Sequence, residues 1–384
     1  MRTFLEEKIE LIYNERESDL SDISIIIPNK RAAVYIQKYL SEQNKTALFA
    51  PEILTINEWI DRNTSKKIIT QTELLFILYD VHCKIERADA EDFDGFIKWG
   101  RIILSDFDEI DRYLIPPRLI FKDLRNIKEI ENWSFLEEEL SDGQEKYITL
   151  WDKLPEYYKS LHDELEERNV LYQGAAYKNF YDDLVNPEIV NDLSSYYYFI
   201  GFNALSNSEE QIMRYLIKDR KATCYFDIDK SYFDNTEHEA GHFYRKILRS
   251  WNLKKEVGDH FNETPKRIEV IETAQQIAQT KIAGSIIQEL AAAGENMDQT
   301  AIVLADESLL IPLTRSLPET IERANITMGY PLKFSHLKGL VDIIFDLQFN
   351  FQKFSSNRIY HKSLLNYLDH PYLIDLIDDA KRIA

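Results

Sequence analysis

Hydrophobic residues recur along the chain in two rhythms, one typical of buried strands and one typical of helices. Residues 4–13 place apolar side chains three and four positions apart, which predicts an amphipathic helix. The run ISIIIP at 23–28 is continuous, β-branched and stopped by a proline, as in a short buried strand. A helical pattern, AAVYIQKYL, follows after three polar residues. Because helices flank this strand on both sides, the pattern predicts an α/β protein.

A long helical stretch follows. The segment ILTINEWI at 53–60 offers Thr55 or Asn57 as the cap of a helix. From about residue 70 to residue 190, apolar residues recur at i, i+3 and i+4 with acids between them. This rhythm predicts a block of amphipathic helices with acidic outer faces.

Strand patterns return after this block. YYYFIGF at 196–202 and ATCYFDID at 222–229 predict two buried strands, separated by a helix that starts near Ser208. The polar segment 258–267 has the composition of a linker. Beyond it, IEVIET, TAIVLA and ITMGYPL predict three further strands that alternate with helices. Alternation of strands and helices predicts parallel sheets.

These patterns divide the chain into four predicted parts. Residues 1–65 and 190–260 form a first α/β domain, and residues 66–189 form a helical insertion within it. Residues 266–334 begin a second α/β domain, and residues 335–384 form a helical segment.

Composition narrows the chemistry that the chain can support. It has 384 residues but only 11 glycines, and no two of them are spaced for the G-x-G-x-x-G turn of a dinucleotide site. Gly95 and Gly100 have the spacing of a Walker A loop, but Arg101 and Ile102 follow where that loop needs Lys and Ser or Thr. The sequence therefore excludes both glycine-rich phosphate loops.

Charge and cysteine usage bear on partners and compartment. The formal net charge of −20 disfavours strong nucleic-acid binding over an extended surface, so any such contact is expected to be local. Cys83 and Cys224 lie in apolar stretches, which predicts two buried thiols in a reducing compartment. No apolar run approaches the roughly 20 residues that cross a bilayer. We expect a cytoplasmic protein without membrane contact.

Three motifs could carry chemistry. Asn29, Lys30 and Arg31 lie where a strand ends and a helix begins, which presents backbone N–H groups and two cations to an anion such as phosphate. The same pattern also fits an ordinary surface turn. The run 102–109, apolar and then acidic, looks like a Walker B strand. Its periodicity instead predicts a helix whose acids face water.

The third motif is His238-Glu239-Ala240-Gly241-His242, which matches H-E-x-x-H. On a helix this spacing places two imidazoles on one face for zinc, with a glutamate base beside them. The alternative is an exposed, capped helix start, and the polar stretch before the motif favours that interpretation.

Several segments, taken in order, resemble one family. SIIIPNKRAAVYIQKYL is similar to motif Ia of superfamily 1 helicases, in which a strand delivers a polar turn and a helix onto single-stranded DNA. YFIGFNALSNSEEQIMRYL resembles a strand, turn and helix of AddB-type subunits. TAIVLADESLLIPLTRSLPETIERANITMGYPL resembles the opening of a second helicase domain, and HKSLLNYLDHPYL the helical segment after it. Together they resemble AddB-like or RecB-like helicase-nuclease subunits, the Bacteroidetes proteins of the PD-(D/E)XK nuclease superfamily.

This resemblance implies RecA-like domains of the superfamily 1 helicase and P-loop NTPase type, with a large helical insertion and a degenerate nucleotide site. Ile200 stands where a Walker B acid is expected, and Ala305 stands where active helicases carry an arginine. The nuclease motif with its Mg²⁺ site is absent, so the resemblance implies the N-terminal helicase-like portion of a longer nuclease. No cofactor is expected in this chain.

The function implied is a catalytically inactive module of an AddAB/RecBCD-type DNA-repair helicase-nuclease. Its expected partners are single-stranded DNA or double-stranded DNA ends and an AddA-like helicase subunit. No catalytic residue is expected, and the residues expected to contact DNA are Asn29, Lys30, Arg31, Ser206, Asn207 and Thr327. Two alternatives stay open: a zinc-dependent metallopeptidase built on His238, Glu239 and His242, and a protein-interaction scaffold that binds no DNA.

Overall fold

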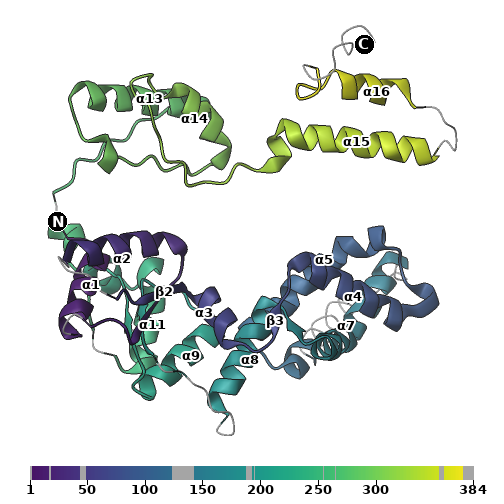
Figure 1. The fold of residues 1–384 in the computed structure, drawn as a ribbon, viewed down its shortest axis with the longest axis horizontal. Coiled ribbons are helices and arrows are strands. Elements are labelled where there is room, and N and C mark those ends of the chain that lie inside the picture. The colour runs from purple at the N-terminus through teal and green to yellow at the C-terminus, as the bar shows by residue number, and fades with distance from the viewer. Residues whose placement is uncertain are drawn as a thin grey trace. The chain divides into compact units, whose positions relative to one another are not determined.

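The protein divides into two compact units, which we call unit 1 (Met1–Lys266) and unit 2 (Arg267–Ala384) (Figure 1). The computed structural model describes residues 2–16, 19–43, 49–122, 142–186, 193, 195–253, 255–263, 265–353 and 359–374. The division falls within the segment 258–267 that has the composition of a linker.

Unit 1 is built on a four-stranded parallel sheet, so the α/β prediction is confirmed there. Its strands are β1 (Ile23–Ile27), β2 (Glu52–Thr55), β5 (Tyr196–Ile200) and β6 (Ala222–Tyr225), in the order β2-β1-β5-β6. The segments ISIIIP, YYYFIGF and ATCYFDID are strands as predicted. The short strand β2 was not predicted, because its four residues merge with the helical pattern after Thr55.

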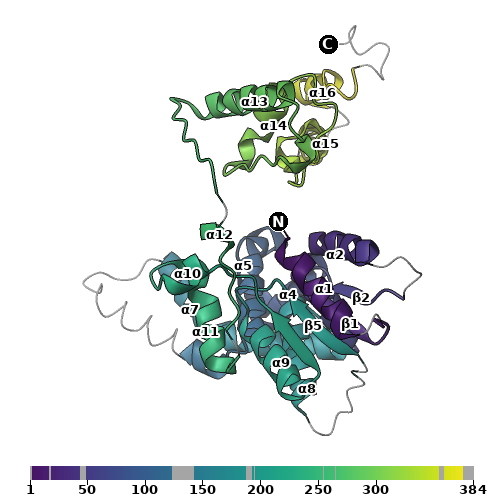
Figure 2. The same cartoon turned by 90° about the vertical axis from the view of Figure 1, so that its left-hand side faces the viewer.

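One face of the sheet is covered by α1 (Phe4–Glu15) and α2 (Lys30–Gln43), as Figure 2 shows. Successive side chains of a strand point to opposite faces, and Ile25 therefore packs with Tyr198 against these two helices. A continuous apolar strand is what a sheet covered on both faces requires.

The other face packs on α3 (Ile56–Asn63), α8 (Gln173–Val185) and α9 (Asn207–Lys218). Trp59 on α3 is 2% exposed and makes edge contacts with Phe180, Tyr197 and Phe199. Thr55 begins α3 with a capping box to Glu58, as one of the two predicted caps.

A helical block lies between α3 and α8 in the sequence, where an insertion was predicted. It contains α4 (Gln71–Glu86), α5 (Phe93–Arg112) and α7 (Asp142–Glu167), with a short η1 turn (Arg87–Asp89). A small parallel pair, β3 (Lys67–Ile68) with β4 (Val170–Leu171), joins the two ends of the block. Residues 123–141 and 187–189 of the predicted insertion lie outside the described residues.

After β6 the chain forms a group of short helices that completes unit 1. Its elements are α10 (Lys230–Asp234), η2 (Glu239–Gly241), α11 (His242–Trp251) and α12 (His260–Glu263). The bridge between Asp229 and Gly258 returns the chain to the end of β6.

The described residues of unit 2 form helices: α13 (Gln276–Ala292), η3 (Met297–Gln299), η4 (Glu307–Leu309), α14 (Leu310–Ser316), η5 (Leu332–Phe334), α15 (His336–Lys353) and α16 (His361–Leu368). The strands predicted at IEVIET, TAIVLA and ITMGYPL are not formed, so this part of the prediction is wrong. A strand requires a hydrogen-bonded neighbour and a buried face. Val270 is 92% and Val303 is 88% exposed, so these segments have neither. Residues 354–358 and 375–384 of the predicted C-terminal helical segment lie outside the described residues.

Two further findings concern the whole chain. Cys224 packs against the core and burial raises its pKa, but Cys83 is exposed on α4, which corrects the prediction of two buried thiols. In the part of the chain that the structure describes, we find no helix with both the length and the apolar character of a membrane span.

Candidate nucleic-acid interface at the carboxyl edge of the sheet

The predicted contact segment 29–31 lies at the carboxyl edge of the sheet of unit 1. All four strands run parallel, so their carboxyl ends share one edge. From β1 the chain passes to β2 on one side, and later places β5 on the other side of β1. In open α/β sheets, ligands bind outside the carboxyl ends at such a reversal of strand order. The segment after β1 and the turn after β5 flank this position.

At the start of α2, the side chain of Asn29 is already engaged. Its Oδ1 accepts a hydrogen bond from the backbone N–H of Arg31 at 3.1 Å, which caps the helix. The Lys30 side chain is 79% exposed, and its Nζ lies 2.6 Å from Glu58 Oε1. Lys30 therefore offers an exposed cation at the edge, while Asn29 shapes the turn.

Glu58 is a site residue that the DNA-contact prediction missed. Hydrogen bonds from Lys30 and from Thr55 lower its pKa to about 2, so it stays charged at neutral pH. A phosphate that binds Lys30 must replace this carboxylate. Exposed ion pairs of this kind contribute little, about 0–1 kcal/mol, so the exchange is inexpensive. The pattern Thr55-x-x-Glu58 is the signal that could have identified the residue.

The turn after β5 contains two more predicted contacts, Ser206 and Asn207. Ser206 is 7% exposed and caps α9 in a reciprocal box with Glu209. Asn207 donates from Nδ2 to the carbonyl oxygen of Tyr113 at 2.9 Å. Both side chains therefore hold the turn in place, and Gly201, at φ +80°, supplies its left-handed bend. The helix begins at Asn207, one residue before the predicted start at Ser208.

Thr327, the last predicted contact, lies in unit 2. It is exposed, in an irregular segment between α14 and η5. Five of the six predicted residues therefore belong to unit 1, where they follow the carboxyl ends of β1 and β5, and Thr327 belongs to unit 2.

The two nucleotide-site patterns both fall inside helix α5. Gly95 and Gly100 belong to α5, as does the whole run 102–109. The helix predicted for that run is confirmed. Asp106 and Glu109 are exposed, but Asp108 accepts a hydrogen bond from Gly174 N at 2.6 Å, so not all of its acids face water.

The H-E-x-x-H motif does not lie on one continuous helix. His238 is extended, at φ −84° and ψ 123°, and its Nδ1 accepts from Ala240 N at 3.1 Å to cap η2. His242 begins α11 on the next turn and is exposed. Within the described ranges, no three His, Cys, Asp or Glu side chains are grouped so that they could hold a metal ion.

A buried polar network in the helical block was not predicted. Asp111, whose side chain is fully buried, lies 3.1 Å from His162 Nε2 and 3.1 Å from Lys178 Nζ, and it accepts from the hydroxyls of Tyr158 and Tyr172. Burial alone raises the pKa of Asp111, but these hydrogen bonds and the charge of His162 overcome it and lower the pKa to about 2. The network ties α5, α7 and α8 together.

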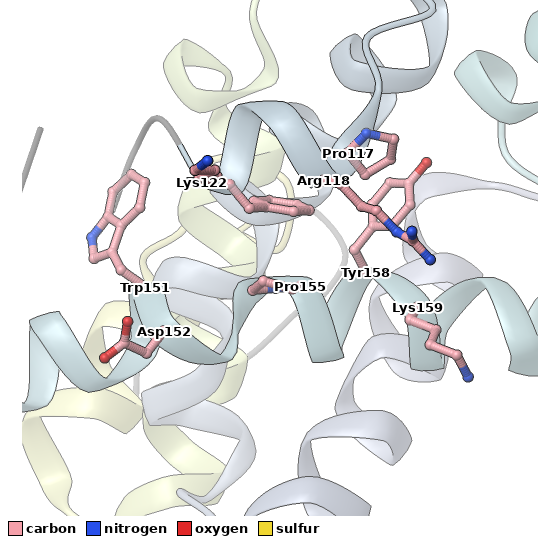
Figure 3. A pocket seen from close by; sticks show the side chains of 9 residues that line it. Pro117, Arg118, Lys122, Trp151, Asp152, Pro155, Tyr158 and Lys159 are labelled. Carbon is pink, nitrogen blue, oxygen red and sulfur yellow. The ribbon is translucent and has the colours of Figure 1, made fainter. Parts of the chain in front are cut away.

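The helical block also carries a hollow of about 630 Å³, shown in Figure 3. Trp151, Pro155 and Tyr158 of α7 line one side, and Arg118 and Lys122 lie across from them. Pro155 lies inside α7 and has no N–H to donate within the helix. The wall is mainly apolar, and its charged residues are Arg118, Lys122, Lys159 and Asp152.

No protein-family model and no curated protein matches this chain.

Proposed function

We propose that the chain is a catalytically inactive, helicase-like module of an AddAB/RecBCD-type DNA-repair helicase-nuclease, with a RecA-like first domain. The observation that carries this proposal is the place of residues 29–31, directly after β1 and beside the reversal of strand order. The resemblance to motif Ia implies this arrangement of strand, polar turn and helix. In place of a glycine-rich phosphate loop, β1 is followed by Pro28 and Asn29, which supports a silent nucleotide site.

In this proposal Lys30 and Arg31 neutralise phosphates of single-stranded DNA. Lys30 exchanges Glu58 for a phosphate, while Asn29 and Ser206 hold their turns in shape. The net charge of −20 keeps this contact weak. An AddA-like motor subunit would supply the remaining affinity.

The test is fluorescence anisotropy of the full chain with a labelled oligo-dT, over a series of salt concentrations. Each phosphate contact on single strands contributes about 0.7 to the slope of log K against log salt, so Lys30→Gln with Arg31→Gln should reduce the slope by about 1.4. The matched control is Lys98→Gln with Arg101→Gln, two exposed cations on α5. An equal slope in both variants refutes the contact, and ATP hydrolysis by the chain refutes the silent module.

A protein-interaction scaffold without DNA binding is the second candidate, and the mainly apolar hollow of Figure 3 favours it. Under this alternative, Trp151→Ala should weaken co-purification with an AddA-like motor, while no oligonucleotide binding is seen in any variant. The zinc alternative predicts stoichiometric zinc in the purified protein that is lost in His242→Ala.

A further inference from the structure

Helix α11 carries a stripe of basic residues that the proposed DNA contact does not use. The stripe consists of His242, Arg245, Lys246 and Arg249, spaced by three, one and three positions, so all four lie along one side of the helix. His242, Lys246 and Arg249 are exposed, and Arg245 is half-buried.

The stripe lines a hollow of about 560 Å³ together with Thr236 and Ser250. The described residues that line it include no carboxylate, although the chain has 66 acids against 46 Lys and Arg. Asp234, Glu237 and Glu239 of the preceding loop are not part of this lining. A concave surface with four basic side chains and no acid is an exception in so acidic a protein.

Arg245 fixes the shape of this hollow. Its guanidinium donates to five backbone carbonyls of α10 and of the loop after it, at 2.9 to 3.2 Å: those of Tyr232, Phe233, Asn235, Thr236 and His238. Gly241 makes this possible, because a Cβ there would overlap both the guanidinium and the Tyr232 carbonyl oxygen. The loop, and Thr236 with it, is thus held against α11.

The other cations remain available to a ligand. Lys246 lies 3.7 Å from Glu210, a long ion pair at an exposed lysine. Arg249 forms no ion pair with any residue that the structure describes. A guanidinium presents a planar fork of donors that matches phosphate oxygens.

We propose that this hollow binds a phosphate-bearing polyanion through Lys246 and Arg249, with His242 beside them and Arg245 as the positioning residue. Apart from the imidazole of His242, the lining has no aromatic or aliphatic side chain that could hold a base, so phosphate groups are the main chemistry recognised. The hollow is larger than one phosphate, which favours consecutive phosphates. Their source is a nucleic-acid backbone or a free polyphosphate compound. The inference does not depend on the proposed contact at the sheet edge.

The probe is sodium tripolyphosphate, titrated calorimetrically into the full chain at low salt. We expect Lys246→Gln with Arg249→Gln to abolish or strongly weaken binding. The matched control, Lys98→Gln with Arg101→Gln, has the same residue types and the same spacing on exposed positions of α5 and should bind like the wild type. A wild type that does not bind, or a stripe variant that binds like the control, overturns the proposal.

The same variants in the oligo-dT assay identify the source of the phosphate. If the stripe variant loses about 1.4 of the salt slope, the ligand is a nucleic-acid backbone. If only tripolyphosphate binding falls, the ligand is a free phosphate compound. Failure of the edge contact shows in the oligo-dT salt slope of Lys30→Gln with Arg31→Gln. Failure of the stripe shows in the tripolyphosphate affinity of Lys246→Gln with Arg249→Gln, so the two failures are distinguishable.

Discussion

Unit 1 and unit 2 contain segments of similar composition in opposite environments. In unit 1, ISIII at 23–27 pairs with strands on both sides, and all five residues are buried. In unit 2, IEVIET and TAIVLA have the same β-branched character, but they form no ladder and expose their valines. Local composition makes a strand possible, and neighbouring strands make it stable. We therefore expect substitutions in the core of unit 1 to lower stability far more than substitutions in the exposed segments of unit 2.

The largest expected effect is at Trp59, which fills the layer between the sheet and α8. Trp59→Ala should lower the free energy of unfolding of unit 1 by about 4 kcal/mol, because it leaves a large cavity among Phe180, Tyr197 and Phe199. Phe345→Ala, at a side chain 68% exposed in unit 2, is the counterpart. For Phe345→Ala, denaturant titration followed by circular dichroism should show a free energy of unfolding within about 0.5 kcal/mol of the wild-type value. Equal effects would contradict the comparison.

The next effect tests the buried charge of the helical block. Asp111→Asn should cost about 3 kcal/mol, since it leaves Lys178 and His162 facing a neutral amide. The folded pKa of Asp111, about 2, is below the ordinary value of 3.8, so its stabilisation is complete above about pH 4 and is lost as the pH falls toward 2.

Unfolding measured across this range should therefore show a shallower loss of stability in Asp111→Asn than in the wild type. The control is Asp106→Asn, at an exposed acid on the same helix. If Asp111→Asn loses stability with falling pH as steeply as the wild type, the ionised Asp111 carboxylate does not stabilise the fold.

A third substitution tests the packing between α13 and α14 of unit 2. Gly284 on α13 lies against α14, and a Cβ there would overlap the carbonyl oxygen of Ser316. Gly284→Ala should destabilise this helix pair by about 2 kcal/mol through overpacking. Gly329→Ala, where a Cβ meets nothing within 4 Å, is the control. Limited proteolysis should cleave unit 2 faster only in the first variant.

The smallest effect is expected in the extended segments of unit 2. Val303→Thr should change stability by less than about 0.5 kcal/mol, because Val303 is 88% exposed. Ile25→Thr, at a fully buried position of β1, puts a hydroxyl into the core and should be clearly destabilising. Amide hydrogen exchange offers an independent check: residues 301–304 should exchange quickly and residues 23–27 slowly. Strong protection of the amides of residues 301–304 from exchange would show that this segment is hydrogen-bonded and would contradict its description as unpaired.

Sequence reasoning succeeded where the signal is local. The proline after 23–27, the helical spacing of 93–112 and the cap at Thr55 each act within one turn or strand, and each prediction is confirmed. It failed for the three strands predicted in unit 2, because strand pairing depends on residues distant in sequence, whereas helices are present between and after these segments as predicted. The polar segment at 29–31 was identified from its place after a strand, but its partner Glu58 belongs to the next helix along the chain.

The structural contacts of two residues could have been inferred from patterns in the sequence. Ser206 and Glu209 form the S-x-x-E pattern of a capping box, so the serine is engaged within its own helix. Asp111 follows Leu104 by seven positions and Phe107 by four, which places it on the apolar stripe of α5. Its partners on α7 and α8 could not be deduced, because they depend on how three helices meet.

The helical block has a consequence for the order in which this protein can fold. Ile23 pairs with Tyr196, although the entire block lies between them in the sequence. During synthesis, β1 and β2 emerge long before β5, and their apolar faces stay without the central partner until the block has been made. Because non-local pairing slows folding, we expect the sheet to close only after the block has been made. A premature stop within the block would release an exposed pair of hydrophobic strands, so the insertion also sets the period during which the nascent chain needs protection from aggregation.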